Sequence, residues 1–129
     1  MTTIDIGTAP SARVLSARTR AAYASDWALF TDHCAVTDRP ALPADPQTVV
    51  DFLSSCPAAP ATRRRRVAAI DHHHAAAGYA RPGESVAVRA ALGRLEIIDR
   101  QKAAERDRDL QAKNAPHQRK PARDGRRRD

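Results

Sequence analysis

The chain has 129 residues, which is enough for one domain with a tail but too few for two domains of ordinary size. Hydrophobic residues make up 42% of the chain but aromatic residues only 4%, so alanine dominates the apolar set, which favours closely packed helices over a sheet. No apolar run approaches the roughly 18 residues of a membrane span, and the N-terminus lacks the basic start and apolar core of a signal peptide. We therefore expect an all-α protein of the cytoplasm.

Positive charge is concentrated in the second half of the chain. Residues 1–60 carry 4 basic and 6 acidic residues, whereas residues 61–129 carry 18 basic and 9 acidic residues, and the whole chain has a net charge of +7. Clustered arginine is the electrostatic footprint of a nucleic-acid binder, because each neutralised phosphate releases condensed counterions. The sequence thus predicts a nucleic acid as a partner, with a merely solvated basic protein as the alternative.

A first helix is predicted to follow a loose arm at residues 1–11. Its N-cap is Ser16, and an aromatic stripe with spacings of four, three and four marks its core face: Tyr23, Trp27, Phe30 and Cys34. Its first turn holds Arg18, Thr19 and Arg20, where backbone N–H groups also point outward. These three residues therefore either meet a phosphate or are simply solvated.

A second helix is predicted after a connection broken by three prolines, DRPALPADP. Asp45 and Pro46 are expected as its N-cap and first residue, and it should stop before Pro57. Its apolar face is Val49, Val50, Phe52, Leu53 and Cys56. Because Cys34 and Cys56 show no CxxC spacing, we interpret them as buried thiols rather than a disulfide or a metal pair.

The central element of the chain is a helix predicted over residues 61–78, with Pro60 and Gly78 as its stops. Projected at about 100° per residue, its packed side is Arg63, Val67, Ile70, His74 and Ala77. The other side is Arg65, Arg66, Ala69, His72 and His73. We expect Arg65 and Arg66 to be exposed, so that replacing both by alanine spares the fold, and Arg63 to bury its stem. Thr62 either donates to a phosphate or caps the helix.

A fourth helix is predicted after the turn-rich stretch YARPGES. Its buried side is Val88, Ala91, Leu92, Leu95 and Ile98. Residues 100–129 carry 11 basic and 5 acidic residues, and Leu110 is their only large apolar residue. We therefore expect three parts: a flexible arm (1–11), a helical domain (12–99), and a basic tail (100–129) that is a frayed helix and then disordered.

The sequence gives little support for a metal site or for catalysis. Side chains at three consecutive helix positions fan over about 200° and cannot ligate one ion together, so His72, His73 and His74 predict no zinc site. We interpret His74 as a core residue, and His72 and His73 as solvated or facing phosphates. The sequence holds no glycine-rich phosphate loop, nucleophile elbow or paired carboxylates, so neither a cofactor nor catalysis is expected.

The order of these features resembles the N-terminal core-binding domain of the tyrosine recombinases, the phage-integrase family. The resemblance covers roughly residues 12–99 and runs through Ser16, Thr19, Arg20, Tyr23, Asp26, Trp27, Phe30 and Cys34, then LPADPQTVVDFL, ATRRRRVAAIDHHHAAAG and VRAALGRL. It implies a four-helix, SAM-like bundle that closes over one face of a DNA duplex. The DNA contacts that it implies are Arg18, Thr19, Arg20, Thr62, Arg63, Arg64, Arg65, Arg66 and His73 or His74.

The sequence departs from that family after the core-binding region. Family members continue into a catalytic domain with a nucleophilic tyrosine, whereas the only tyrosines here are Tyr23 and Tyr79, inside the region of resemblance. The expected function is therefore a DNA-binding module without cleavage activity of its own, from a truncated or frameshifted recombinase or a module used alone, with a full-length recombinase as a further partner. The alternatives are a helical adaptor for a protein partner and half of a split recombinase.

Overall fold

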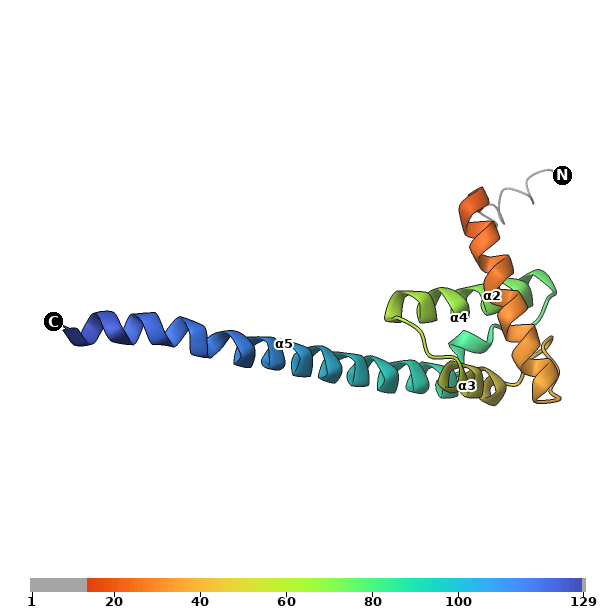
Figure 1. The fold of residues 1–129 in the computed structure, drawn as a ribbon. Helices are drawn as coiled ribbons and strands as arrows, with labels where there is room; N and C mark the ends of the chain where they lie inside the picture. The colour runs from red at the N-terminus through yellow and green to blue at the C-terminus, as the bar shows by residue number, and fades with distance from the viewer. Residues whose placement is uncertain (1–13, 129) are drawn as a thin grey trace. The chain divides into compact units, whose positions relative to one another are not determined.

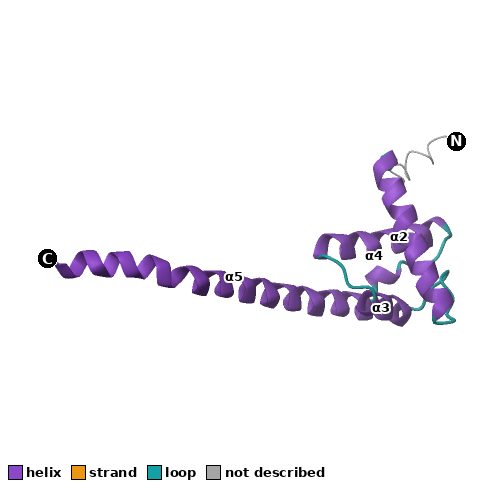
Figure 2. Cartoon of the chain, viewed as in Figure 1, coloured by secondary structure: helices purple, strands orange, loops and turns teal. Residues whose placement is uncertain are grey.

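A computed structural model of the chain describes the backbone of residues 14–128 and the side chains of residues 14–114, and all its regular structure is helical (Figure 1). The elements are α2 (Ala17–Val36), α3 (Pro46–Ser55), α4 (Pro60–Ala76), a 3₁₀ turn η1 (Pro82–Glu84) and α5 (Val86–Arg128). Short loops and turns join them, and residues 14–128 contain no strand (Figure 2). The all-α prediction is thus confirmed for this part of the chain. The chain divides into two compact units, with the boundary after Arg89.

The helices begin where the sequence places their caps, with one difference. The Ser16 side chain accepts a hydrogen bond of 3.0 Å from the Thr19 N–H, and the Asp45 carboxylate accepts one of 2.8 Å from the Gln47 N–H, so both predicted N-caps are confirmed. Pro60, expected as a stop ahead of the central helix, is instead its first residue. Proline fits there because the first N–H of a helix needs no intrahelical partner.

Two helices end in the same left-handed cap. After α4, Gly78 has a φ of 87° and the Tyr79 N–H donates to the His74 carbonyl at 2.8 Å, which is a Schellman motif. After α2, Asp38 takes the left-handed position with a φ of 56°, and the Arg39 N–H donates to the Cys34 carbonyl at 2.9 Å. The predicted role of Gly78 is confirmed.

The core of the first unit joins residues from every helix in it. The largest fully buried side chains include Phe30, Val49, Phe52, Ile70, His74 and Val88. The rings of Phe30 and Phe52 meet edge to face at 5.2 Å, which couples α2 to α3. The predicted aromatic stripe of α2 is buried at Phe30 and Cys34 and half-buried at Tyr23 and Trp27. Among the cysteines, Cys34 is buried as predicted, whereas Cys56 is half-buried, and neither forms a disulfide.

Helix α5 begins in the first unit and continues in the second. Val88 is buried as predicted, Leu92 and Leu95 are half-buried, and Ile98 is exposed, which differs from its predicted place on a buried side. The backbone is helical through Arg128, so the structure describes helix where the sequence predicts a frayed and then disordered tail. The predicted disorder stays a prediction, and the predicted arm at residues 1–11 lies outside the described residues.

Candidate nucleic-acid interface on α2 and α4

Helices α2 and α4 cross and pack against each other within the first unit (Figure 1). Their N-terminal parts are strongly cationic: residues 17–25 and 60–70 contain six arginines and no acidic residue. The nearest acidic residue on α2 is Asp26, and its side chain is buried with a relative exposure of 4%. Within α2 and α4, positive charge is therefore concentrated toward their N-terminal parts.

Asp26 of α2 and Arg65 of α4 form an ion pair with two hydrogen bonds. The Arg65 Nε–H donates to one carboxylate oxygen of Asp26 at 2.7 Å, and an Nη2–H donates to the other at 3.0 Å. This two-bond geometry is characteristic of arginine with a carboxylate or a phosphate. It raises the pKa of Arg65 above its ordinary value, chiefly through the hydrogen bond to Asp26 and then through the carboxylate charge, so Arg65 stays a cation.

Arg66 shares the same carboxylate. Its Nε lies 4.0 Å from an Asp26 oxygen, an Nη1–H donates to the Cys56 carbonyl at 3.0 Å, and only 18% of its side chain is exposed. Arg65 is exposed as predicted, but Arg66 is half-buried, and both arginines engage a buried carboxylate. The prediction that replacing both by alanine removes no buried contact is therefore wrong. The arginine side chain is long enough to turn back from the outer face of α4 and reach a carboxylate on α2.

Four aromatic or imidazole rings lie where α2 packs against α4. The Trp27 indole and the His73 imidazole are stacked at 4.4 Å with an interplanar angle of 2°, and the Tyr23 ring lies 5.5 Å from the His72 ring. The His73 Nδ1 lies 3.0 Å from the Ala69 carbonyl and donates to it. His73 is half-buried and its ring packs against the Trp27 indole, whereas His72 is exposed. Ala69 itself is fully buried, although the helical projection places it on the outer side.

Two of the predicted DNA contacts are core residues. His74 is fully buried, accepts from the Ala44 N–H at its Nε2 (2.8 Å) and donates from its Nδ1 to the Ile70 carbonyl (2.8 Å). Arg63 has a relative exposure of 5% and donates from Nη1 to the Ala58 carbonyl at 3.2 Å. These placements confirm the predicted core roles of Arg63 and His74. They also remove both residues from the candidate interface, because a phosphate cannot reach them.

The remaining predicted contacts lie at or near the surface. Arg18, Arg20 and Arg64 are exposed, while Thr19 and Thr62 are half-buried. An Arg20 Nη1–H donates to the Leu15 carbonyl at 2.6 Å, which holds that side chain along the start of α2. The Ser16 hydroxyl donates to the Thr19 hydroxyl at 2.9 Å. Thr62 lies inside the first turn of α4 and not at its N-cap, which is Ala59, so its capping alternative is excluded.

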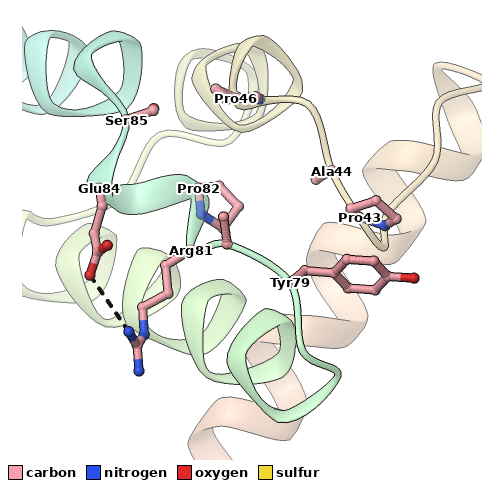
Figure 3. Close-up of a pocket in the computed structure, with 9 residues that line it drawn as sticks. Pro43, Ala44, Pro46, Tyr79, Arg81, Pro82, Glu84 and Ser85 are labelled. Carbon is pink, nitrogen blue, oxygen red and sulfur yellow. Dashed lines mark ion pairs between the residues drawn. The ribbon is translucent and has the colours of Figure 1, made fainter.

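A hollow of the first unit lies beside η1, and its nine lining residues include three prolines, Pro43, Pro46 and Pro82 (Figure 3). An Arg81 Nη1 and a Glu84 carboxylate oxygen pair across one edge at 3.7 Å, while the Tyr79 hydroxyl points away from that pair. The charges of Arg81 and Glu84 thus compensate each other. The hollow therefore attracts an anion less strongly than the exposed arginines of α2 and α4 do.

The described part of the chain contains neither a metal-ligand cluster nor a membrane-spanning helix. Residues 14–114 hold no group of three or more His, Cys, Asp or Glu side chains placed to share a metal ion. None of the described helices combines the length and the apolar character that crossing a bilayer requires.

Comparison with known proteins gives no relative for this chain: no protein-family model matches it, and no curated protein is similar to it.

Sequence reasoning missed the role of Asp26. The signal was present, because Asp26 is three residues after Tyr23 and four before Phe30, which puts it on the same face of α2 as the aromatic stripe. A carboxylate on a core-facing stripe needs a cationic or hydrogen-bonding partner. An arginine run elsewhere in the chain was the candidate partner.

Proposed function

We propose that this chain is a DNA-binding module that contacts duplex DNA mainly through phosphates and does not cleave DNA by itself. The observation that carries the proposal is the charge of the α2 and α4 pair: residues 17–25 and 60–70 hold six arginines and no acidic residue, and four of these arginines are exposed, namely Arg18, Arg20, Arg64 and Arg65. Such a surface attracts a polyanion, because binding releases the counterions condensed on the duplex. The resemblance to the core-binding domain of tyrosine recombinases supports the same conclusion.

The side chains around these arginines support close approach of a phosphate backbone. Exposed positions in the first half of α2 include Ala21, Ala24 and Ser25, and the outer face of α4 includes Ala61. Small side chains leave the arginine tips as the outermost groups of the surface. The phosphate contacts that we propose are Arg18, Arg20, Thr62, Arg64, Arg65 and His72, with Thr19 and His73 at the margin.

The proposed role in recombination follows from the resemblance. A core-binding module occupies a recombination site, and it either assists a full-length enzyme there or competes with it. Double-stranded DNA and a full-length recombinase are therefore the proposed partners. The nucleoid is the proposed location.

A gel-shift series with duplex DNA across salt concentrations tests the proposal. The log of the affinity should fall linearly with the log of the salt concentration, with a slope of about −0.9 per phosphate contact. Replacing Arg18 and Arg64 by alanine should weaken binding to every duplex and make the slope shallower by roughly one for each phosphate that is no longer neutralised.

The matched control is Arg39→Ala, because Arg39 lies in the loop after α2 and pairs with Asp51 of α3 at 2.9 Å. That variant removes one positive charge away from the candidate interface and should bind nearly as the wild-type chain does. The proposal is wrong if the wild-type chain does not shift duplex DNA at low salt. It is also wrong if Arg39→Ala weakens binding as much as Arg18→Ala alone.

A further inference from the structure

The contact between Asp26 and Arg65 leaves part of the guanidinium unused. A guanidinium has five N–H donors, and Asp26 takes the Nε–H and one Nη2–H of Arg65. Arg65 makes no other hydrogen bond among the described residues. The edge formed by Nη1 and the second Nη2–H therefore remains available for a second bidentate partner. The side chain of Arg65 is 45% exposed, so a ligand in solution can reach this residue.

The carboxylate that holds Arg65 is itself buried. Asp26 lies in the middle of α2, is 4% exposed, and stands on the core-facing side of that helix. Arg66 balances the same carboxylate from 4.0 Å, so the three side chains together keep one net positive charge. Arg65 is thus oriented by Asp26 without the whole cluster becoming neutral.

From this geometry we infer that Asp26 is a positioning residue, which fixes the open edge of the Arg65 guanidinium toward a single phosphate of bound DNA. The inference rests on the proposed function, because it assigns a role within that DNA-binding surface. Arginine binds phosphate best through two parallel N–H bonds. An unrestrained arginine must lose side-chain freedom to make both bonds, whereas one already held by a buried carboxylate loses less.

Asp26→Asn separates positioning from simple electrostatics because the two make opposite predictions. Removing a negative charge beside a DNA-binding surface should tighten binding if charge alone matters. Asparagine, however, presents an NH₂ group to one of the two Arg65 donors, which breaks the two-bond geometry. We expect Asp26→Asn to bind duplex DNA about five- to tenfold more weakly, the loss that corresponds to about one ordinary hydrogen bond.

The matched control is Asp32→Asn. Asp32 lies on the same helix and is exposed, so the substitution makes the same change in net charge without breaking the Arg65 contact. Asp32→Asn should bind as tightly as the wild-type chain or slightly more tightly. Circular dichroism and thermal unfolding of each variant establish that the full-length chain is folded at the temperature of the binding assay.

Arg65→Lys provides a second test that keeps Asp26 paired with a cation. Lysine retains the charge but not the planar fork, so affinity should fall several-fold while the salt slope stays the same. In the Arg65→Lys background, Asp26→Asn should cost no further affinity, because there is no fork left to position. If Asp26→Asn unfolds the chain, the Arg65→Lys comparison alone decides.

The outcomes separate the two proposals. If the wild-type chain binds no duplex DNA, the proposed function fails and the positioning role fails with it. If the wild-type chain binds, but Asp26→Asn binds equally or more tightly, or Arg65→Lys binds as the wild type does, then only the positioning role is overturned.

Discussion

At the scale of single residues, Asp26 links the stability of the first unit to its proposed interface. A buried carboxylate is costly unless it is paired and hydrogen-bonded. Here two arginines from consecutive positions of α4 meet it, one through two hydrogen bonds and the other at 4.0 Å. The same arginine run that supplies positive charge to the surface therefore also holds α2 against α4.

Replacing both Arg65 and Arg66 by alanine should lower the melting temperature by several degrees. The substitution leaves the Asp26 carboxylate buried without either cation, and it removes the Arg66 hydrogen bond to the Cys56 carbonyl. Thermal unfolding followed by circular dichroism measures the effect. Adding Asp26→Asn to the double variant should restore part of the stability, since the uncompensated charge is then gone. An unchanged melting temperature in the double variant would contradict the structural role of the pair.

Asp71 should make the first unit less stable as the pH rises from acid to neutral. Burial raises the pKa of Asp71 above its ordinary value of 3.8, against the opposing effect of the hydrogen bond from the Gly83 N–H at 2.7 Å. The folded state therefore holds this proton more tightly than the unfolded state. The Asp71 contribution is most favourable below the ordinary value and is lost as the pH rises through the raised pKa.

Asp71→Asn removes this pH dependence while keeping an oxygen that accepts from the Gly83 N–H. The variant should unfold at a higher temperature than the wild-type chain at pH 7, and the difference should vanish below about pH 4, where the wild-type carboxyl is protonated. Thermal melts over a pH series measure both. A variant that is less stable than the wild type at pH 7 would show that the carboxylate charge stabilises the fold.

At the scale of helices, local sequence signals were sufficient for the ends of the elements and insufficient for the arginine contacts. Ser16, Asp45 and Gly78 act within a few residues of themselves, so the chain near each one determines the cap. The helical projection of α4 also placed Arg63 and His74 on the packed side. It missed the Arg65 contact because a projection gives the direction of the Cα–Cβ bond, whereas the position of the guanidinium depends on a partner 39 residues away.

Helix α4 approaches η1 closely because Gly83 has no side chain. A Cβ built there would meet the Asp71 carboxylate and would lie 2.7 Å from a Val67 methyl group. Gly83→Ala should therefore destabilise the unit by about 1–3 kcal/mol, as overpacking usually does. Gly93→Ala is the control, because its Cβ meets nothing within 4 Å in α5, and it should be neutral or stabilising by up to about 1 kcal/mol. Denaturant unfolding measures both, and equal effects would contradict the close approach.

At the scale of the whole molecule, positive charge is present in both units, so their shares of DNA binding must be separated. Residues 100–129 carry a net charge of +6 from 11 basic and 5 acidic residues. A basic segment without a packed surface binds DNA through counterion release alone, whereas the α2 and α4 face also offers oriented side chains. Deleting residues 100–129 should therefore make the salt slope shallower but leave the response to Arg18→Ala and Arg64→Ala intact. If the deletion abolished both affinity and that response, the tail would be the DNA-binding element.

The whole chain should leave DNA covalently intact. Its two tyrosines are poorly placed for nucleophilic attack: Tyr23 is half-buried beside His72, and the exposed Tyr79 directs its hydroxyl away from the Arg81 and Glu84 pair. A tyrosine hydroxyl is a weak nucleophile at neutral pH unless a base or cations activate it. Incubation with supercoiled plasmid should accordingly give no nicked product and no protein–DNA adduct that survives denaturation. An adduct that disappears in Tyr79→Phe would instead identify Tyr79 as a nucleophile and make this chain an enzyme.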